Sequence, residues 1–104
     1  MNTLPNNFDS IEKIIFDEGV RIEAVDIHPE LDVMLIILNT KAVLRQKLSV
    51  YSRLKGAAKA SLLQYELIGE GTGIHWPLLD EDLSLKGFLR DELLMVVKKD
   101  TLAA

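Results

Sequence analysis

The segment that most constrains the fold is a run of six consecutive apolar residues, Val33 to Leu38, between Asp32 and Asn39. Its length fits a strand, and its uniformly apolar character predicts a strand covered on both faces. The β-branched segment Val20 to Ile27 predicts a preceding strand with a bulge, because its apolar residues do not alternate cleanly. Val43 to Ser49 predicts the return strand of a hairpin. These segments together favour an antiparallel sheet.

The turns and the faces of the return strand follow from the same pattern. His28-Pro29-Glu30 predicts one turn and Asn39-Thr40-Lys41 the next, in which Asn39 would tolerate a positive φ. Alternation in the return strand places Leu44 and Leu48 on one face and the bases Arg45 and Lys47 on the other. The sequence therefore predicts a basic strand face.

Three helices are predicted around these strands. The spacing of Ile11, Ile14 and Ile15 predicts a short helix over about 10–17, and residues 57–67 are rich in helix formers. A longer helix follows residue 84, capped by Asp82 or Ser84. Its apolar stripe comprises Leu85, Phe88, Leu89, Leu93, Val96 and Val97.

Alternate glycines, Gly69, Gly71 and Gly73, precede a short strand over 74–76. They allow positive φ, expected at Gly73, and close approach of another segment. The fold prediction is a small single α+β domain over 1–104. It has an antiparallel sheet of about three to four strands and two or three helices, with loose ends at 1–8 and 100–104.

Composition excludes several classes of protein. The 104 residues contain no cysteine, which excludes disulfides, thiol catalysis and zinc sites that need sulfur. Two histidines, His28 and His75, exclude a metal site built on three. The longest apolar run is too short to cross a bilayer, and Met1 to Phe8 lacks the features of a signal peptide. We therefore expect a cytoplasmic protein with no membrane contact and no cofactor.

Charge is distributed unevenly along the chain, whose net charge is −4. Residues 33–65 contain no acid and six bases: Lys41, Arg45, Lys47, Arg53, Lys55 and Lys59. Either these bases face the acidic segments on both sides of them, or they form a basic face for an anionic partner. The acidic balance of the whole chain leaves nucleic-acid contact weak or mediated by a partner.

His75, Asp80 and Asp82 supply the side chains for a metal or acid/base site. The alternative is that the acids cap the last helix while His75 lies half-buried beside Trp76. Trp76, the one tryptophan, suits either a core position or an interface hot spot.

The run Leu67 to Ser84, LIGEGTGIHWPLLDEDLS, resembles the signature of a bacterial family, domain of unknown function family 2442. Members resemble one another in G-x-G-x-G-I-H-W-P-x-L/I-D-E-D-L/I-S, with a glycine three residues on. The matching residues are Gly71, Gly73, Ile74, His75, Trp76, Pro77, Asp80, Glu81, Asp82, Ser84 and Gly87. Upstream, Tyr51-Ser52-Arg53-Leu54 is similar to the family's Y-P-R-L, with Ser52 in place of proline. The likeness covers residues 48–89 and implies a small α+β fold with an antiparallel sheet.

The resemblance implies no reaction. Members of the family are often encoded beside small toxin-like proteins, which implies a non-enzymatic protein-binding module, antitoxin-like or adaptor, in a two-protein system. The candidate partner-binding residues are Lys41, Arg45, Lys47, Arg53 and Trp76. The alternatives are an enzyme centred on His75, Asp80 and Asp82, and an accessory transcriptional regulator. An exposed edge strand would also allow a homodimer.

Overall fold

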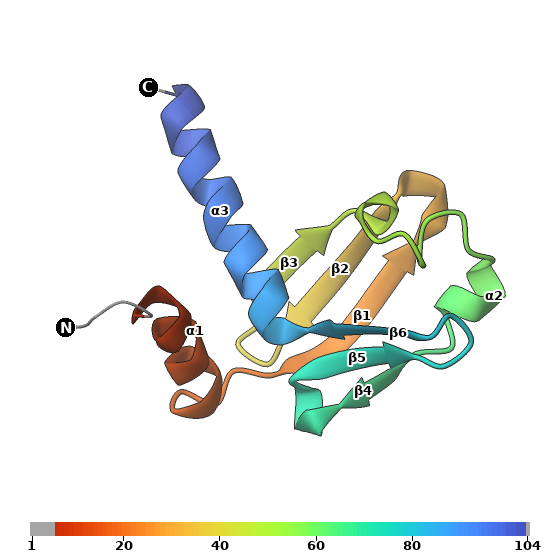
Figure 1. Ribbon diagram of the computed structural model, residues 1–104, viewed down its shortest axis with the longest axis horizontal. Coiled ribbons are helices and arrows are strands. Elements are labelled where there is room, and N and C mark those ends of the chain that lie inside the picture. Colours follow the sequence, from red (N-terminus) through yellow and green to blue (C-terminus); the bar gives the residue numbers. More distant parts are fainter. Residues whose placement is uncertain (1–5, 104) are drawn as a thin grey trace.

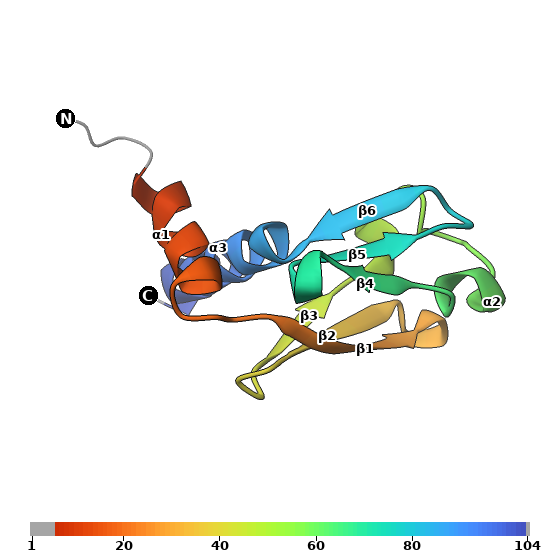
Figure 2. The same cartoon turned by 90° about the horizontal axis from the view of Figure 1, so that it is seen from below.

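Two antiparallel sheets of three strands each, with three α-helices, make up residues 6–103, for which this computed structural model describes the backbone; side chains are described for residues 10–97. The α+β class is confirmed. The strands form two sheets, however, and not the single sheet of three to four strands that the sequence predicts. Figure 1 shows the arrangement, and Figure 2 shows the sheets as two stacked layers.

The first sheet has the strand order β1-β2-β3, with β1 at Ile22–His28, β2 at Val33–Leu38 and β3 at Val43–Gln46. The predicted bulge is present, as a shift of register between Ile22 and Ala24. In β2, burial alternates along the strand: Met34, Ile36 and Leu38 are buried, whereas Val33, Leu35 and Ile37 are only half-buried. The prediction that both faces are covered is therefore wrong, because the second sheet packs against one face only.

The predicted turn between β2 and β3 is present, and its positive φ falls on another residue than Asn39. Lys41 has the positive φ, 79°, and not Asn39. The Asn39 side chain instead accepts a hydrogen bond from the Arg21 N–H and donates one to the Gly19 carbonyl. This residue thus fastens the hairpin to the segment before β1.

The second sheet has the order β4-β5-β6, with β4 at Glu66–Ile68, β5 at Gly73–Trp76 and β6 at Glu81–Ser84. The helix predicted over 57–67 shrinks to α2, Lys59–Leu62, and its last residues become β4. The Tyr65 hydroxyl donates a hydrogen bond to the Val25 carbonyl of β1 at 3.0 Å, which holds this part of the chain against the first sheet. Tertiary contacts here outweigh helix propensity.

Three short 3₁₀ turns connect the strands: η1 (Pro29–Leu31), η2 (Leu48–Val50) and η3 (Gly69–Gly71). The core lies between the sheets and under the start of α3, Leu85–Ala103. Its most deeply buried large side chains are Trp76, Phe88, Met34, Ile36, Leu54, Leu62, Ile74 and Leu85.

Both ends of the chain are more regular than predicted. The first helix, α1, begins at Asn6 and ends at Phe16, so residues 6–8 are helical. Residues 100–103 belong to α3, while residues 1–5 and 104 lie outside the described part of the chain. A salt bridge of 2.7 Å between Lys86 and Glu12 connects α3 to α1.

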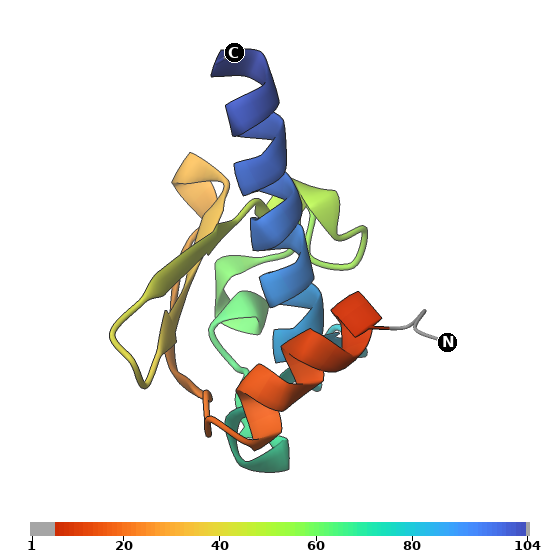
Figure 3. The same cartoon turned by 90° about the vertical axis from the view of Figure 1, so that its left-hand side faces the viewer.

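The first turns of α3 are buried, whereas its later turns extend beyond both sheets (Figures 1 and 3). Leu85 and Phe88 of the predicted apolar stripe are buried, but Leu93, Val96 and Val97 are exposed. The stripe is therefore not one continuous core face. Among residues 6–103, no helix combines the length and apolar character needed to cross a membrane.

Candidate functional site

The signature residues lie mainly on the β5–β6 hairpin and its two flanks, and the structure gives most of them a contact within the fold. At one flank is the η3 turn. Gly71 has φ +94°, and a Cβ on this residue would lie 2.8 Å from the Ile22 carbonyl oxygen of β1. Only glycine allows this backbone contact between the two sheets without displacement.

Gly73 does not have the positive φ expected from the sequence. It lies within β5, opposite Ile68 of β4 and Ser84 of β6. The Ile68 side chain covers it, because a Cβ there would lie 3.2 Å from an Ile68 methylene carbon. A side chain at this position would therefore be limited by space and not by backbone conformation.

Trp76 is fully buried at the end of β5. Its indole N–H donates a hydrogen bond of 2.9 Å to the Leu62 carbonyl, and its ring lies 6.4 Å from that of Tyr65. The indole therefore joins α2 to the second sheet. This corrects the expectation that Trp76 offers a partner an apolar anchor, since no surface of the residue is exposed.

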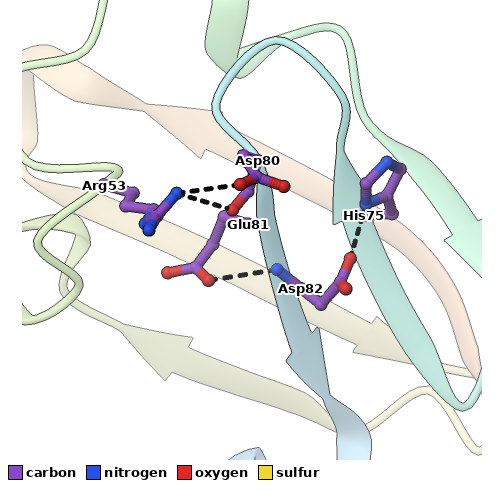
Figure 4. Close-up of polar contacts among 5 residues, drawn as sticks. All are labelled: Arg53, His75, Asp80, Glu81 and Asp82. Atoms are coloured by element: carbon purple, nitrogen blue, oxygen red, sulfur yellow. Dashed lines mark hydrogen bonds and ion pairs between the residues drawn. The ribbon is translucent and has the colours of Figure 1, made fainter.

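The loop between β5 and β6 contacts Arg53, which belongs to the upstream motif of the family resemblance. Arg53, from the Tyr51–Leu54 segment, donates to the Asp80 carbonyl at 3.1 Å and to its carboxylate at 3.2 Å (Figure 4). Asp80 has φ 51°, and its carboxylate and carbonyl both contact the guanidinium. The arginine of the upstream motif thus closes the loop of the downstream one, even without the usual proline.

His75 and Asp82 are direct partners across β5 and β6, and the His75 Nδ1 lies 2.5 Å from the Asp82 carboxylate (Figure 4). This hydrogen bond is the main reason that the pKa of His75 is raised above its ordinary 6.5. Glu66 pairs with His75 from the other side, on β4, and its charge acts in the same direction. The imidazolium form is therefore stabilised on the exposed face of this sheet.

The start of α3 is capped by Ser84. Its hydroxyl accepts a hydrogen bond of 3.0 Å from the Gly87 N–H, three residues on. A Cβ at Gly87 would lie 3.2 Å from that hydroxyl, so glycine leaves room for the cap. The acids before the helix do not cap it: Asp82 faces His75, and Asp80 faces Arg53.

These contacts separate the groups that an enzyme would need to combine. His75 has one bonded carboxylate, because the third member of the proposed set, Asp80, is held by Arg53. In the part of the chain that is described, no cluster of three or more acids and histidines could hold a metal ion. The geometry does not favour a site built on His75, Asp80 and Asp82.

The basic candidates divide into two groups. Lys41 forms a 3.1 Å ion pair with Glu23, and Arg53 one of 3.2 Å with Asp80, so these two face acids of the same chain. Arg45 and Lys47 are exposed and form no ion pair with any side chain in residues 10–97. Lys41 and Arg53 thus face acids of the same chain, as the first interpretation expects, whereas Arg45 and Lys47 form no such ion pair.

Two exposed apolar residues, Leu31 and Val50, lie in η1 and η2, and Lys47 immediately precedes η2. The Asp32 carboxylate accepts hydrogen bonds from the Ser49 N–H at 2.8 Å and from its hydroxyl at 2.6 Å. These bonds bring η1 against η2, and they are the largest cause of the lowered pKa of Asp32, to which Lys47 also contributes. Leu31 and Val50, 70% and 67% exposed, flank the bonded pair.

We call Leu31, Lys47 and Val50, with Arg45 at the border toward α3, the η1–η2 surface. Sequence reasoning found its bases but missed Leu31 and Val50. Pro29 predicts the turn that contains Leu31, but residues 48–49 are predicted as part of the return strand, which in the structure ends at Gln46. Only the fold shows that η1 and η2 are adjacent.

The chain is thus a small α+β domain of two three-stranded sheets. The residues of the signature make contacts that hold the parts of this domain together. The chain belongs to the family described as protein of unknown function (DUF2442), which it matches over residues 22–92. No protein with a curated description matches it.

Two solved structures are similar. One is the solution NMR structure of an uncharacterised protein from Chromobacterium violaceum, with 26% identity and a TM-score of 0.64; the match covers 86% of this chain and 82% of that one. The other is the crystal structure of a protein of unknown function from Rhodospirillum rubrum, with 26% identity, a TM-score of 0.62 and coverage of 69% and 87%. Both similarities support the fold. The function has to be inferred from the surface of the chain itself.

Proposed function

We propose that this chain is a non-enzymatic protein-binding module that holds its partner on the η1–η2 surface. The observation that supports this is the combination, in one place, of two bases that form no salt bridge within residues 10–97 and two strongly exposed apolar side chains. Apolar contacts supply affinity at an interface, whereas surrounding charges supply orientation and rate. The matching partner is a protein with an acidic, partly apolar patch.

The family resemblance adds a narrower form of this proposal, in which the chain is the adaptor or antitoxin-like half of a two-protein system. In either form the signature hairpin has a supporting role: it fixes the second sheet against the first. The η1–η2 surface then lies on a rigid support, which reduces the entropy lost when a partner binds.

The test is recovery of a partner from the chain's own host after nuclease treatment, compared between variants. Arg45→Glu/Lys47→Glu reverses the charge of both bases, and its matched control, Lys13→Glu/Lys59→Glu, makes the same charge change at exposed lysines elsewhere. We expect the first variant to bind the recovered protein at least about tenfold more weakly and the control to bind normally. Equal binding by both would contradict the proposal.

A second pair of variants tests the apolar part of the surface. Leu31→Ser/Val50→Ser removes its two exposed side chains, and Leu78→Ser removes one that is 59% exposed in the β5–β6 loop. We expect weaker binding in the first case only. Because all three side chains are exposed, each variant should keep the native circular dichroism spectrum, which separates lost binding from lost folding.

A further inference from the structure

The later part of α3 exposes five consecutive apolar residues. Leu93, Leu94, Met95, Val96 and Val97 are 45–56% exposed. Successive helical residues are turned by about 100°, so five of them surround the helix completely. A helix segment that is apolar on every side is normally enclosed by protein. Figure 1 shows that α3 leads away from the two sheets of its own chain after its first turns.

One side of the segment borders a groove. Glu92, Met95 and Val96 share a helix face, and together with the outer side chains of β2 and β3 they line a space of about 550 Å³. The strand residues of the groove are Leu35, Val43 and Arg45. Val43 is itself 51% exposed, so apolar surface continues from the helix onto the sheet. A second helix could therefore contact both elements at once.

The charges around this segment follow a self-complementary order. Before it stand Arg90, Asp91 and Glu92, and after it stand Lys98, Lys99 and Asp100. Counted outward from Met95, each charge on one side has the opposite sign to the charge at the same distance on the other. The helix continues through all of these positions, to Ala103.

This order selects one kind of partner. In an antiparallel pair of identical helices that cross at Met95, a residue before Met95 lies at the height of the residue equally far after it in the other copy. Acidic positions of one helix are then opposite basic positions of the other, whereas parallel helices would place like charges together. Such a contact is two-fold symmetric and closes on itself.

We propose that this chain forms a symmetric homodimer in which the two α3 helices cross antiparallel at Met95, each contacting the groove of the other copy. This goes beyond the proposed function, because it uses α3 and the groove, whereas the partner protein uses the η1–η2 surface. Arg45 borders both, so Leu31→Ser/Val50→Ser is the variant that separates the two sites. The dimer presents two copies of that surface. It also differs from the edge-strand dimer considered from the sequence, because side chains and not backbone groups form it.

The experiment is sedimentation equilibrium on the purified full chain and on two charge variants. Asp91→Lys/Glu92→Lys makes every charge nearest the apolar segment positive, and Lys98→Glu/Lys99→Glu makes every one negative. We expect the unaltered chain to be dimeric, and each variant to have a dissociation constant at least about tenfold higher. An equimolar mixture of the two variants should form dimers again, because the positive copy then faces the negative copy at both ends.

Two further variants separate this interface from folding and from the proposed function. Met95→Glu places two like charges at the symmetry axis and should give monomers, whereas Leu78→Glu, at another exposed residue, should remain dimeric. Leu31→Ser/Val50→Ser should also stay dimeric while losing the partner protein. Trp76 fluorescence and circular dichroism should remain native in all of them.

Each possible outcome bears on the proposal. A monomeric unaltered chain at about 100 μM, a dimer that both charge variants retain, or a mixture that stays monomeric would overturn the dimer. Partner binding that persists in a monomeric chain would overturn the dimer and leave the proposed function standing. A dimer that binds no partner protein would overturn the proposed function and leave the dimer standing.

Discussion

Replacing Gly71 by alanine tests the contact that joins the two sheets. The new Cβ would lie 2.8 Å from the Ile22 carbonyl oxygen and 3.1 Å from the Cβ of Arg21, both on a strand or its immediate flank. The backbone can accommodate the new Cβ only if β1 moves away from η3. The positive φ of +94° costs about 1–2 kcal/mol for a residue with a side chain, and overpacking adds about 1–3 kcal/mol. We expect unfolding free energy to fall by about 2–5 kcal/mol in total.

Gly56→Ala is the matched control, because Gly56 also has a positive φ, +71°, but a Cβ there would meet no atom within 4 Å among the described residues beyond its two chain neighbours. It should lose only the conformational part, about 1–2 kcal/mol. Urea denaturation followed by the fluorescence of Trp76, the single tryptophan, measures both variants. If Gly71→Ala costs no more than Gly56→Ala, the close approach of η3 to β1 does not hold the sheets together.

Three further predictions concern the core and the hairpin. Phe88→Ala should lower unfolding free energy by about 3–5 kcal/mol in urea denaturation, since this side chain is only 1% exposed; a loss below about 1 kcal/mol would contradict its core position. Trp76→Phe should cost about 2–4 kcal/mol by circular dichroism, because it leaves a buried carbonyl of α2 without its donor; an unchanged urea midpoint would refute this role. The raised pKa of His75 means that its protonated form stabilises the fold: this contribution is complete below pH 6.5 and is lost as pH rises through the raised pKa. Asp82→Asn should therefore reduce the fall in stability above pH 6.5, measured by urea denaturation across pH, and a profile identical to that of the unaltered chain would count against the pair.

Particular residues show why the site was only partly predictable. The bulge in β1 and the opposite faces of Leu44 and Arg45 follow from local alternation, and both predictions are confirmed. Residues 63–68 have helical composition, yet β4 forms there, because Tyr65 bonds to β1 and Glu66 pairs with His75 across the sheet. These partners are distant in sequence, so no local pattern could reveal them.

The sequence by itself determined the α+β class, most of the strands, the opposite faces of Leu44 and Arg45 in β3, and the family to which the chain belongs. These features depend on the periodicity of the apolar residues, on turn residues and on one specific motif, all of which can be read from neighbouring positions in the sequence. Only the tertiary structure decided that Trp76 is buried, that Arg53 bonds to Asp80 and not to a partner, and that η1 lies beside η2. Whether a side chain is covered depends on which distant segment packs over it, and that is a property of the whole fold.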